Sequence, residues 1–269
     1  MTSNSFSPAT LIGFNKTIAA LRSISIVLVV LFHLRIPGFS GGFIGVDIFF
    51  VISGFLMTRQ VLKGFLEGKN KRLQIVANFY GNRIRRLFPL AMFWIFSTLF
   101  LSFVFSKAYF DRTIVDAIAS LMFLMNFRLI ENANDYFDSK LSPSLLQHFW
   151  TLSVEMQLYI VLPIVFILVF SLFKGNVWRQ RTVAVAAAFL CVISLMLQIT
   201  TDQFVTNYYD TLLRMFPFFS GACLAILRNF RKPNYPNHGF SRFISILCFL
   251  GIGILQLTSI NSANYLGGG

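Results

Sequence analysis

The sequence is poor in charged residues, and this scarcity decides the class of protein. Asp, Glu, Lys and Arg make up 12% of the 269 residues, whereas 56% are hydrophobic and 33 are Phe. A soluble domain of this length would need more polar side chains to cover its surface. The composition therefore excludes a soluble globular protein and predicts an all-α fold, a polytopic transmembrane helical bundle with seven or eight membrane segments.

Cysteine is also scarce. Cys191, Cys223 and Cys248 lie in apolar stretches and show no paired spacing. This pattern suggests neither a disulfide framework nor a metal site. We expect no metal ion and no prosthetic group.

Acidic residues are the rarest charged class, with 10 Asp and Glu against 23 Lys and Arg, which gives a net charge of +13. The basic residues stand in short segments between apolar runs. Such segments orient the helices in the membrane and contact anionic lipid headgroups. We therefore expect membrane lipids as partners, and no nucleic acid.

The first apolar run begins after Lys16 and could imitate a secretory signal. No small-residue cleavage site precedes the next hydrophobic segment, so we interpret the run as a retained helix over Thr17 to Leu34. In LRSISIVLVVLFH, Arg22 and His33 fall within roughly 20° of one another on a helix and about 16 Å apart along its axis.

Both side chains therefore point the same way, and His33 is expected deep inside the bilayer. Polar groups there cost roughly 3 kcal/mol each and usually face a polar cavity. The alternative is that Arg22 is an interfacial anchor and His33 a hydrogen-bonded interior histidine.

The second apolar run, Phe43 to Met57, contains a carboxylate. Asp47 would have to be protonated or matched to a cation in this setting. Gly54 lies seven residues further on the same helical face, beside Ser53, and small residues there would let another helix approach closely. Packing alone is the alternative explanation for Gly45 and Gly54.

The most basic segment runs from Arg59 to Arg86, and we interpret it as a cytoplasmic loop. It ends in FYGNRIRRLFP, which places Arg83, Arg85 and Arg86 just before the next apolar run. Arginines at a membrane face bind phosphates in bidentate fashion, or they simply stop translocation.

A further motif, HFWTLSVEMQLYIVLP, carries His148 and Glu155 on one helical face about 10 Å apart. Glu155 would be buried and would need a proton or a partner for its charge. Tyr159 could complete a polar stripe with them. The alternative is a packing pair without chemistry.

Hydropathy places the remaining spans at Pro89 to Ser106, Leu152 to Phe173, Thr182 to Thr200, Thr211 to Leu227 and Phe240 to Leu257. The segment from Thr113 to Phe127 is shorter. If it crosses the membrane fully, two basic loops fall outside the cell, against the positive-inside tendency. We therefore favour a re-entrant segment, with the loop at Lys174, Arg179 and Arg181 in the cytoplasm.

From about Phe14 to Leu162, four motifs occur in this order: LRSISIVLVVLFH, GGFIGVDIFFVISGFL, FYGNRIRRLFP and HFWTLSVEMQLYIVLP. In this respect the sequence resembles the acyltransferase-3 family of integral membrane O-acyltransferases. The resemblance implies transfer of an acyl group, usually acetyl from acetyl-CoA, to hydroxyls of surface carbohydrates such as lipopolysaccharide O-antigen, other surface polysaccharides and peptidoglycan. It also implies that Arg22 with His33, and the cluster Arg83, Arg85 and Arg86, are functional.

On this reading, Arg22, Arg83, Arg85 and Arg86 bind the phosphates of acyl-CoA, and His33 deprotonates the acceptor hydroxyl. Glu155 or Asp47 would orient His33, and His148 completes the candidate catalytic set. No serine or cysteine stands in a convincing nucleophile setting, so direct transfer is preferred over an acyl-enzyme. We expect a multi-pass protein of the bacterial inner membrane with a cytoplasmic N-terminus.

The expected organisation is a cytoplasmic lead over residues 1–16, a membrane acyltransferase domain over 17–260 and a polar, Gly-rich tail over 261–269. The domain has fewer helices than is typical of the family, which predicts a truncated chain. The alternatives are an inactive relative, a transporter or flippase of a lipid-linked sugar with a proton relay, and a non-catalytic membrane subunit.

Overall fold

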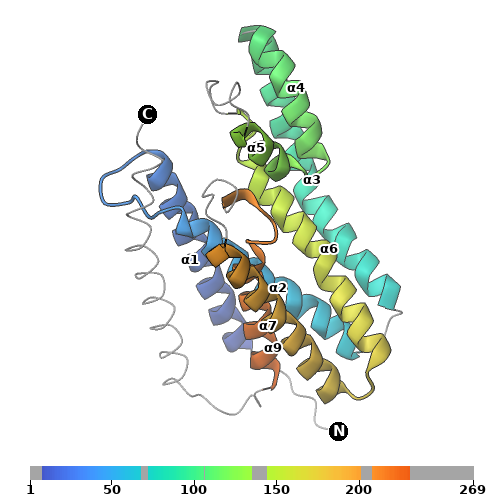
Figure 1. Ribbon diagram of the computed structural model, residues 1–269. Helices are drawn as coiled ribbons and strands as arrows, with labels where there is room; N and C mark the ends of the chain where they lie inside the picture. The colour runs from blue at the N-terminus through green and yellow to red at the C-terminus, as the bar shows by residue number, and fades with distance from the viewer. Residues whose placement is uncertain (1–7, 68–71, 106, 135–143, 201–207, 231–269) are drawn as a thin grey trace. The chain divides into compact units, whose positions relative to one another are not determined.

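The computed structural model describes residues 8–67, 72–105, 107–134, 144–200 and 208–230 (Figure 1). These residues form eight helices and no strand: α1 (Pro8–His33), α2 (Ile44–Glu67), α3 (Arg72–Phe105), α4 (Lys107–Leu121), α5 (Met125–Asn134), α6 (Phe149–Leu172), α7 (Asn176–Thr200) and α9 (Met215–Phe230). The all-α prediction is confirmed. The predicted span Phe240 to Leu257, Cys248 and the tail 261–269 lie outside the described residues.

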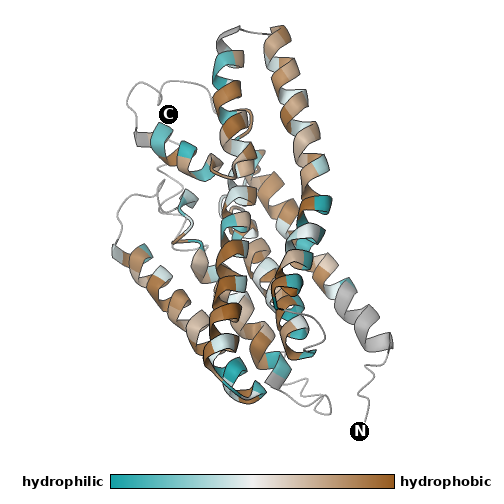
Figure 2. Cartoon of the chain, turned by 90° about the vertical axis from the view of Figure 1, so that its right-hand side faces the viewer, coloured by the Kyte–Doolittle hydropathy of each residue, from teal (hydrophilic) through white to brown (hydrophobic). Residues whose placement is uncertain are grey.

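Five of these helices are long and apolar enough to cross a membrane: α1 from Lys16 onward, α2, α3, α6 and α7. Figure 2 shows hydrophobic colour along most of the long helices, interrupted by short hydrophilic stretches. The chain is therefore a multi-pass membrane protein. Helix α9 has 16 residues, or about 24 Å, and α4 has 15.

The basic segment is helical, which contradicts the predicted loop. Helix α2 continues to Glu67 and α3 already begins at Arg72, so only residues 68–71 separate them. Pro89 lies inside α3 rather than at its start. At 34 residues, α3 is about 51 Å long and exceeds the roughly 30 Å hydrocarbon core. The charges do not end the helix.

The segment Thr113 to Phe127 is divided between two helices. Helix α4 ends at Leu121, Phe123 has a positive φ of 55°, and α5 begins at Met125. A single helix spanning the membrane over this segment is therefore wrong. Arg72 at the start of α3 donates a hydrogen bond of 2.7 Å to Ser171 near the end of α6. If α3 and α6 each cross once, α4 and α5 together add no net crossing, as re-entrance requires.

The chain divides into two compact units. Unit 1 comprises Met1–Ile52 and Asn229–Gly269, and unit 2 comprises Ser53–Arg228. In unit 1, α1 crosses the start of α2 at Gly45, where a Cβ atom would lie 2.3 Å from the Ser25 carbonyl oxygen. Gly45 therefore serves the packing of α1 on α2, which was the alternative explanation for this glycine.

Unit 2 contains the larger core. Helix α4 packs along α3, and α5 and α7 pack against α6 (Figure 1). Fully buried side chains fill the space between the helices, including Leu158, Phe166, Phe218 and Ile226. At Gly54 a Cβ atom would lie 1.9 Å from the Phe218 carbonyl oxygen, so α9 approaches the backbone of α2 directly. The predicted role of Gly54 in helix packing is confirmed.

Candidate active site

In unit 1, Arg22 and His33 lie on the continuous helix α1, as predicted. The half-buried Arg22 places its guanidinium carbon 5.6 Å from the centroid of the Phe49 ring. His33 is the last residue of α1 and is exposed, which contradicts the expected position deep inside the span. The helix stops there because the chain turns through Arg35, whose φ is +53°.

The ring of His33 has a defined tautomer. Its Nδ1 lies 2.8 Å from the carbonyl oxygen of Val29 in the preceding turn. Because a carbonyl oxygen only accepts hydrogen bonds, Nδ1 carries the hydrogen, and in the neutral ring Nε2 has the free lone pair. That atom is the one that can accept a proton.

Asp47 is the acidic residue of the first turn of α2 and is half-buried. A carboxylate at this position is stabilised by the positive end of the helix dipole. Asp47 therefore belongs to unit 1 with Arg22 and His33.

In unit 2, Glu155 is a buried carboxylate with two hydroxyl donors. Ser53 of α2 donates to its Oε1 atom at 2.5 Å, and Tyr159, one turn further along α6, donates to the same oxygen. The three residues are 8%, 1% and 2% exposed, respectively. Among the described residues both hydrogen bonds fall on Oε1, so Oε2 can still accept a proton or a hydrogen bond. The predicted stripe is present for Glu155 and Tyr159 but does not include a contact with His148.

Arg83 extends this cluster from α3. Its guanidinium carbon lies 5.6 Å from the centroid of the Tyr159 ring and 5.8 Å from that of Phe79. Its Nη2 contacts the sulfur of Met57 and donates to Gln60 at 3.3 Å. Arg83 is thus held between α2, α3 and α6.

Arg85 points away from Arg83, because positions 83 and 85 lie about 200° apart on a helix. Arg85 is exposed and donates to Gly81 and Asn82 of its own helix at 3.2 and 2.9 Å. Arg86 is also exposed. The structure therefore divides the predicted cluster into one internal and two exposed guanidinium groups.

His148 occupies the residue before α6 and is exposed. Its ring packs against Phe149 with a centroid distance of 4.9 Å, and partial desolvation lowers the pKa of His148 below its usual 6.5. It lies two helical turns from Glu155, on the spacing predicted, and no contact joins the two side chains within the described ranges.

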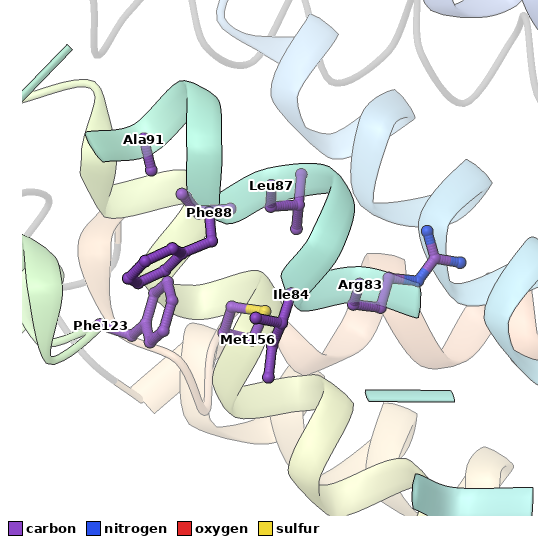
Figure 3. A pocket seen from close by; sticks show the side chains of 8 residues that line it. Arg83, Ile84, Leu87, Phe88, Ala91, Phe123 and Met156 are labelled. Carbon is purple, nitrogen blue, oxygen red and sulfur yellow. The ribbon is translucent and has the colours of Figure 1, made fainter. Parts of the chain in front are cut away.

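A small cavity adjoins the cluster. It has a volume of about 150 Å³ and is lined by Arg83, Ile84, Leu87, Phe88, Ala91, Phe123, Leu152 and Met156. Figure 3 shows the rings of Phe88 and Phe123 and the side chain of Met156 gathered together, whereas the guanidinium of Arg83 points away from them. Apart from Arg83, the lining is apolar.

Two polar networks were not predicted. In the first, Gln157 of α6, Asn126 of α5 and Thr211 form a closed set of hydrogen bonds. Gln157 also donates to the Phe123 carbonyl oxygen at 2.7 Å. The signal in the sequence is a glutamine within the apolar run VEMQLYIVLP.

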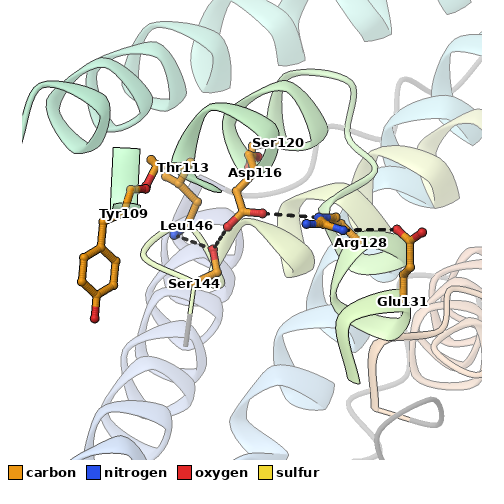
Figure 4. A network of polar contacts seen from close by, with 8 residues as sticks. All are labelled: Tyr109, Thr113, Asp116, Ser120, Arg128, Glu131, Ser144 and Leu146. Carbon is orange, nitrogen blue, oxygen red and sulfur yellow. Dashed lines mark hydrogen bonds and ion pairs between the residues drawn. The ribbon is translucent and has the colours of Figure 1, made fainter. Parts of the chain in front are cut away.

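The second network joins α4, α5 and the segment before α6 (Figure 4). The buried Asp116 carboxylate accepts a hydrogen bond from Ser144 at 2.5 Å and pairs with Arg128 at 3.6 Å. Arg128 also pairs with Glu131 at 3.5 Å. This network fixes the turn between α4 and α5. In the described part of the chain, no group of three His, Cys, Asp or Glu residues could hold a metal ion.

Comparison with known proteins decides the family. The family model described as an acyltransferase domain, that of acyltransferase-3, matches residues 15–267. The chain belongs to the acyltransferase-3 family. The resemblance inferred from the four motifs is thereby confirmed. In this chain the motifs contain Arg22 and His33, Ser53, Arg83, and Glu155.

Several relatives in the family are similar over most of this chain. A putative peptidoglycan O-acetyltransferase, YrhL, of Bacillus subtilis is 34% identical over 210 residues, 77% of this chain and 32% of the relative. The peptidoglycan O-acetyltransferase OatA of Listeria monocytogenes is 33% identical over 242 residues, 87% of this chain and 38% of the relative.

The O-acetyltransferase OatA of Staphylococcus aureus is 29% identical over 228 residues, 82% of this chain and 35% of the relative. The chain thus spans about a third of the length of these curated relatives. No solved structure matches it.

Proposed function

We propose that this chain is a membrane O-acetyltransferase that moves an acetyl group from acetyl-CoA to a hydroxyl of a cell-wall carbohydrate. One observation carries the proposal: side chains from three family motifs meet in unit 2. Ser53, Glu155 and Arg83 come from different motifs, and the Ser53 to Glu155 hydrogen bond joins residues 102 positions apart. Polar residues inside membrane helices are costly, so such a cluster indicates a function.

We assign the exposed guanidinium groups to binding of the acetyl donor, acetyl-CoA. Arg85 and Arg86 lie on the basic part of α3, where bidentate hydrogen bonds can hold the phosphates of coenzyme A. Arg22 is assigned to the same phosphates. Arg83, which lies inside the helix cluster, is also assigned to binding of acetyl-CoA. The basic segment, and with it the N-terminus, lies in the cytoplasm in this proposal, where acetyl-CoA is available.

The transfer step uses His33 as the base. Its Nε2 takes the proton of the acceptor hydroxyl, and the oxygen attacks the thioester carbonyl carbon. The carbon–sulfur bond breaks and coenzyme A leaves as a thiolate, which takes up a proton. Glu155 in unit 2 and Asp47 in unit 1 each orient the polar groups beside them and balance their charge. His148 remains a further candidate catalytic residue.

The names of two relatives favour peptidoglycan as the acceptor. The family resemblance of the sequence alone predicts a surface carbohydrate such as lipopolysaccharide O-antigen as the acceptor. We propose peptidoglycan, acetylated at the outer face of the bacterial cytoplasmic membrane.

The test is acetyl transfer in membranes that contain this chain. Radiolabelled acetyl-CoA is supplied, and base-labile label is counted in muramidase-released peptidoglycan and, separately, in extracted lipopolysaccharide. We expect label in the peptidoglycan fraction, reduced at least a hundredfold by His33→Ala and unchanged by Leu34→Ala at the neighbouring exposed position. Label in neither fraction, or equal label with His33→Ala present at the same level, contradicts the proposal.

A further inference from the structure

Trp150, in the first turn of α6, belongs to an aromatic cluster with the segment that precedes α9. The centroid of its ring lies 4.9 Å from that of Tyr208 and 5.2 Å from that of Tyr209. The guanidinium carbon of Arg214 lies 4.7 Å from the Tyr208 ring and 5.7 Å from the Trp150 ring. These four residues are called the aromatic platform below.

Hydrogen bonds hold the aromatic platform in place. Arg214 Nε donates to the carbonyl oxygen of Tyr208 at 2.8 Å, and Asn126 of α5 donates to that of Tyr209 at 3.3 Å. Trp150 is 5% exposed, whereas Tyr208, Tyr209 and Arg214 are half-buried and partly accessible. The platform therefore has a fixed base and an accessible rim.

The hydroxyl of Tyr209 can donate a hydrogen bond to a ligand. It accepts a hydrogen bond of 2.7 Å from Gln147 Nε2, so its own proton is available to a further acceptor. Burial raises the pKa of Tyr209 above its usual 10, which keeps that proton in place. Within the described ranges of the chain, Tyr209 donates its hydroxyl proton to no acceptor.

The aromatic platform lies at the start of α6, at the end of unit 2 opposite Arg72 and the start of α3. Helix α6 is about 36 Å long and leads from Trp150 to Leu172. At its far end Ser171 accepts the hydrogen bond from Arg72, and Phe170 packs on Phe65 at 5.0 Å. The positive-inside rule assigns that basic end to the cytoplasm, so the platform opens on the outer side.

We propose that the aromatic platform binds the carbohydrate acceptor, a glycan whose sugar rings carry a carboxylate. Sugar rings present flat C–H faces that pack on aromatic rings, the Tyr209 hydroxyl donates to a sugar oxygen, and Arg214 pairs with the carboxylate. The proposal rests on the proposed function, because it names the acceptor site for that transfer. It assigns substrate binding to residues outside the candidate catalytic set.

Binding is measured directly, by calorimetry on the purified full chain in detergent. The two probes are the N-acetylglucosamine–N-acetylmuramic acid disaccharide, which has a carboxylate, and neutral chitobiose. We expect Tyr208→Leu to weaken binding of both probes at least tenfold. Arg214→Gln should weaken only the acidic probe to that extent. Leu212→Ala, at an exposed neighbour, is the matched control, and Tyr208→Phe keeps the ring and should bind normally.

The outcomes separate this site from the proposed function. If the variants fold and bind both probes as the wild type does, the aromatic platform is not the acceptor site, whether or not transfer occurs. If they lose binding but the wild type transfers no acetyl group, the platform is a glycan site and the proposed transferase activity is wrong. In the transfer assay, an effect on the KM for the glycan with unchanged KM for acetyl-CoA supports the site.

Discussion

At the residue scale, one contact of Glu155 could be predicted from the sequence and the other could not. Its pairing with Tyr159 follows from the four-residue spacing on a helix. Its pairing with Ser53 depends on how α2 packs against α6, which no local pattern encodes. The direction of Arg83 was missed for a related reason: its inward orientation depends on α3 running unbroken through the basic segment.

His148 gives the first prediction. The unfolded chain titrates this histidine near pH 6.5, and the folded pKa is lower. Between the two values the unfolded state binds more protons, so stability falls as the pH drops through 6.5 and below. We expect the melting temperature of the detergent-solubilised chain to fall less between pH 7.5 and pH 5.5 in His148→Gln than in the wild type. An equal fall in both would show that His148 titrates normally in the folded state.

At the element scale, α2 and α9 approach each other closely because Gly54 has no side chain. A Cβ at position 54 would meet backbone atoms of Phe218, which cannot move away as the end of a flexible side chain can. The small-residue pattern predicted such an approach, but not which helix makes it. The divided segment around Phe123 was harder to predict, since a positive φ in Phe has no signature in the sequence.

Gly54→Ala is the matching experiment. Overpacking of this kind costs about 1–3 kcal/mol, and we expect the melting temperature to fall by roughly 5 °C. Gly81→Ala is the control, because no atom lies within 4 Å of its added Cβ and alanine favours the helix by about 1 kcal/mol. Equal melting temperatures for the two variants would contradict the close approach of α2 and α9.

At the scale of the whole molecule, the all-helical membrane architecture followed from composition and hydropathy, because a bilayer leaves few other solutions. The lead over 1–16, the domain over 17–260 and the tail over 261–269 remain predictions. The network of Asp116, Arg128 and Ser144 holds the turn between α4 and α5, and the re-entrance of this segment remains a prediction.

The topology can be tested with a cysteine at Asn176, beside the start of α7. The Arg72 to Ser171 hydrogen bond brings this loop to the basic end of unit 2, which we assign to the cytoplasm. We expect an impermeant thiol reagent to label it only after the cells are opened. Labelling of intact cells from outside would contradict re-entrance. A cysteine replacing Leu145, before α6, should show the reverse pattern.

The central claim is that the buried cluster around Glu155 takes part in acyl transfer, and the most direct measurement is the acetyl-transfer rate of Glu155→Gln. This change keeps the size of the side chain and replaces the carboxyl group with an amide. We predict at least a hundredfold loss of base-labile acetyl in peptidoglycan, with the variant present in the membrane at the wild-type level and melting normally. Transfer at the wild-type rate would contradict the account.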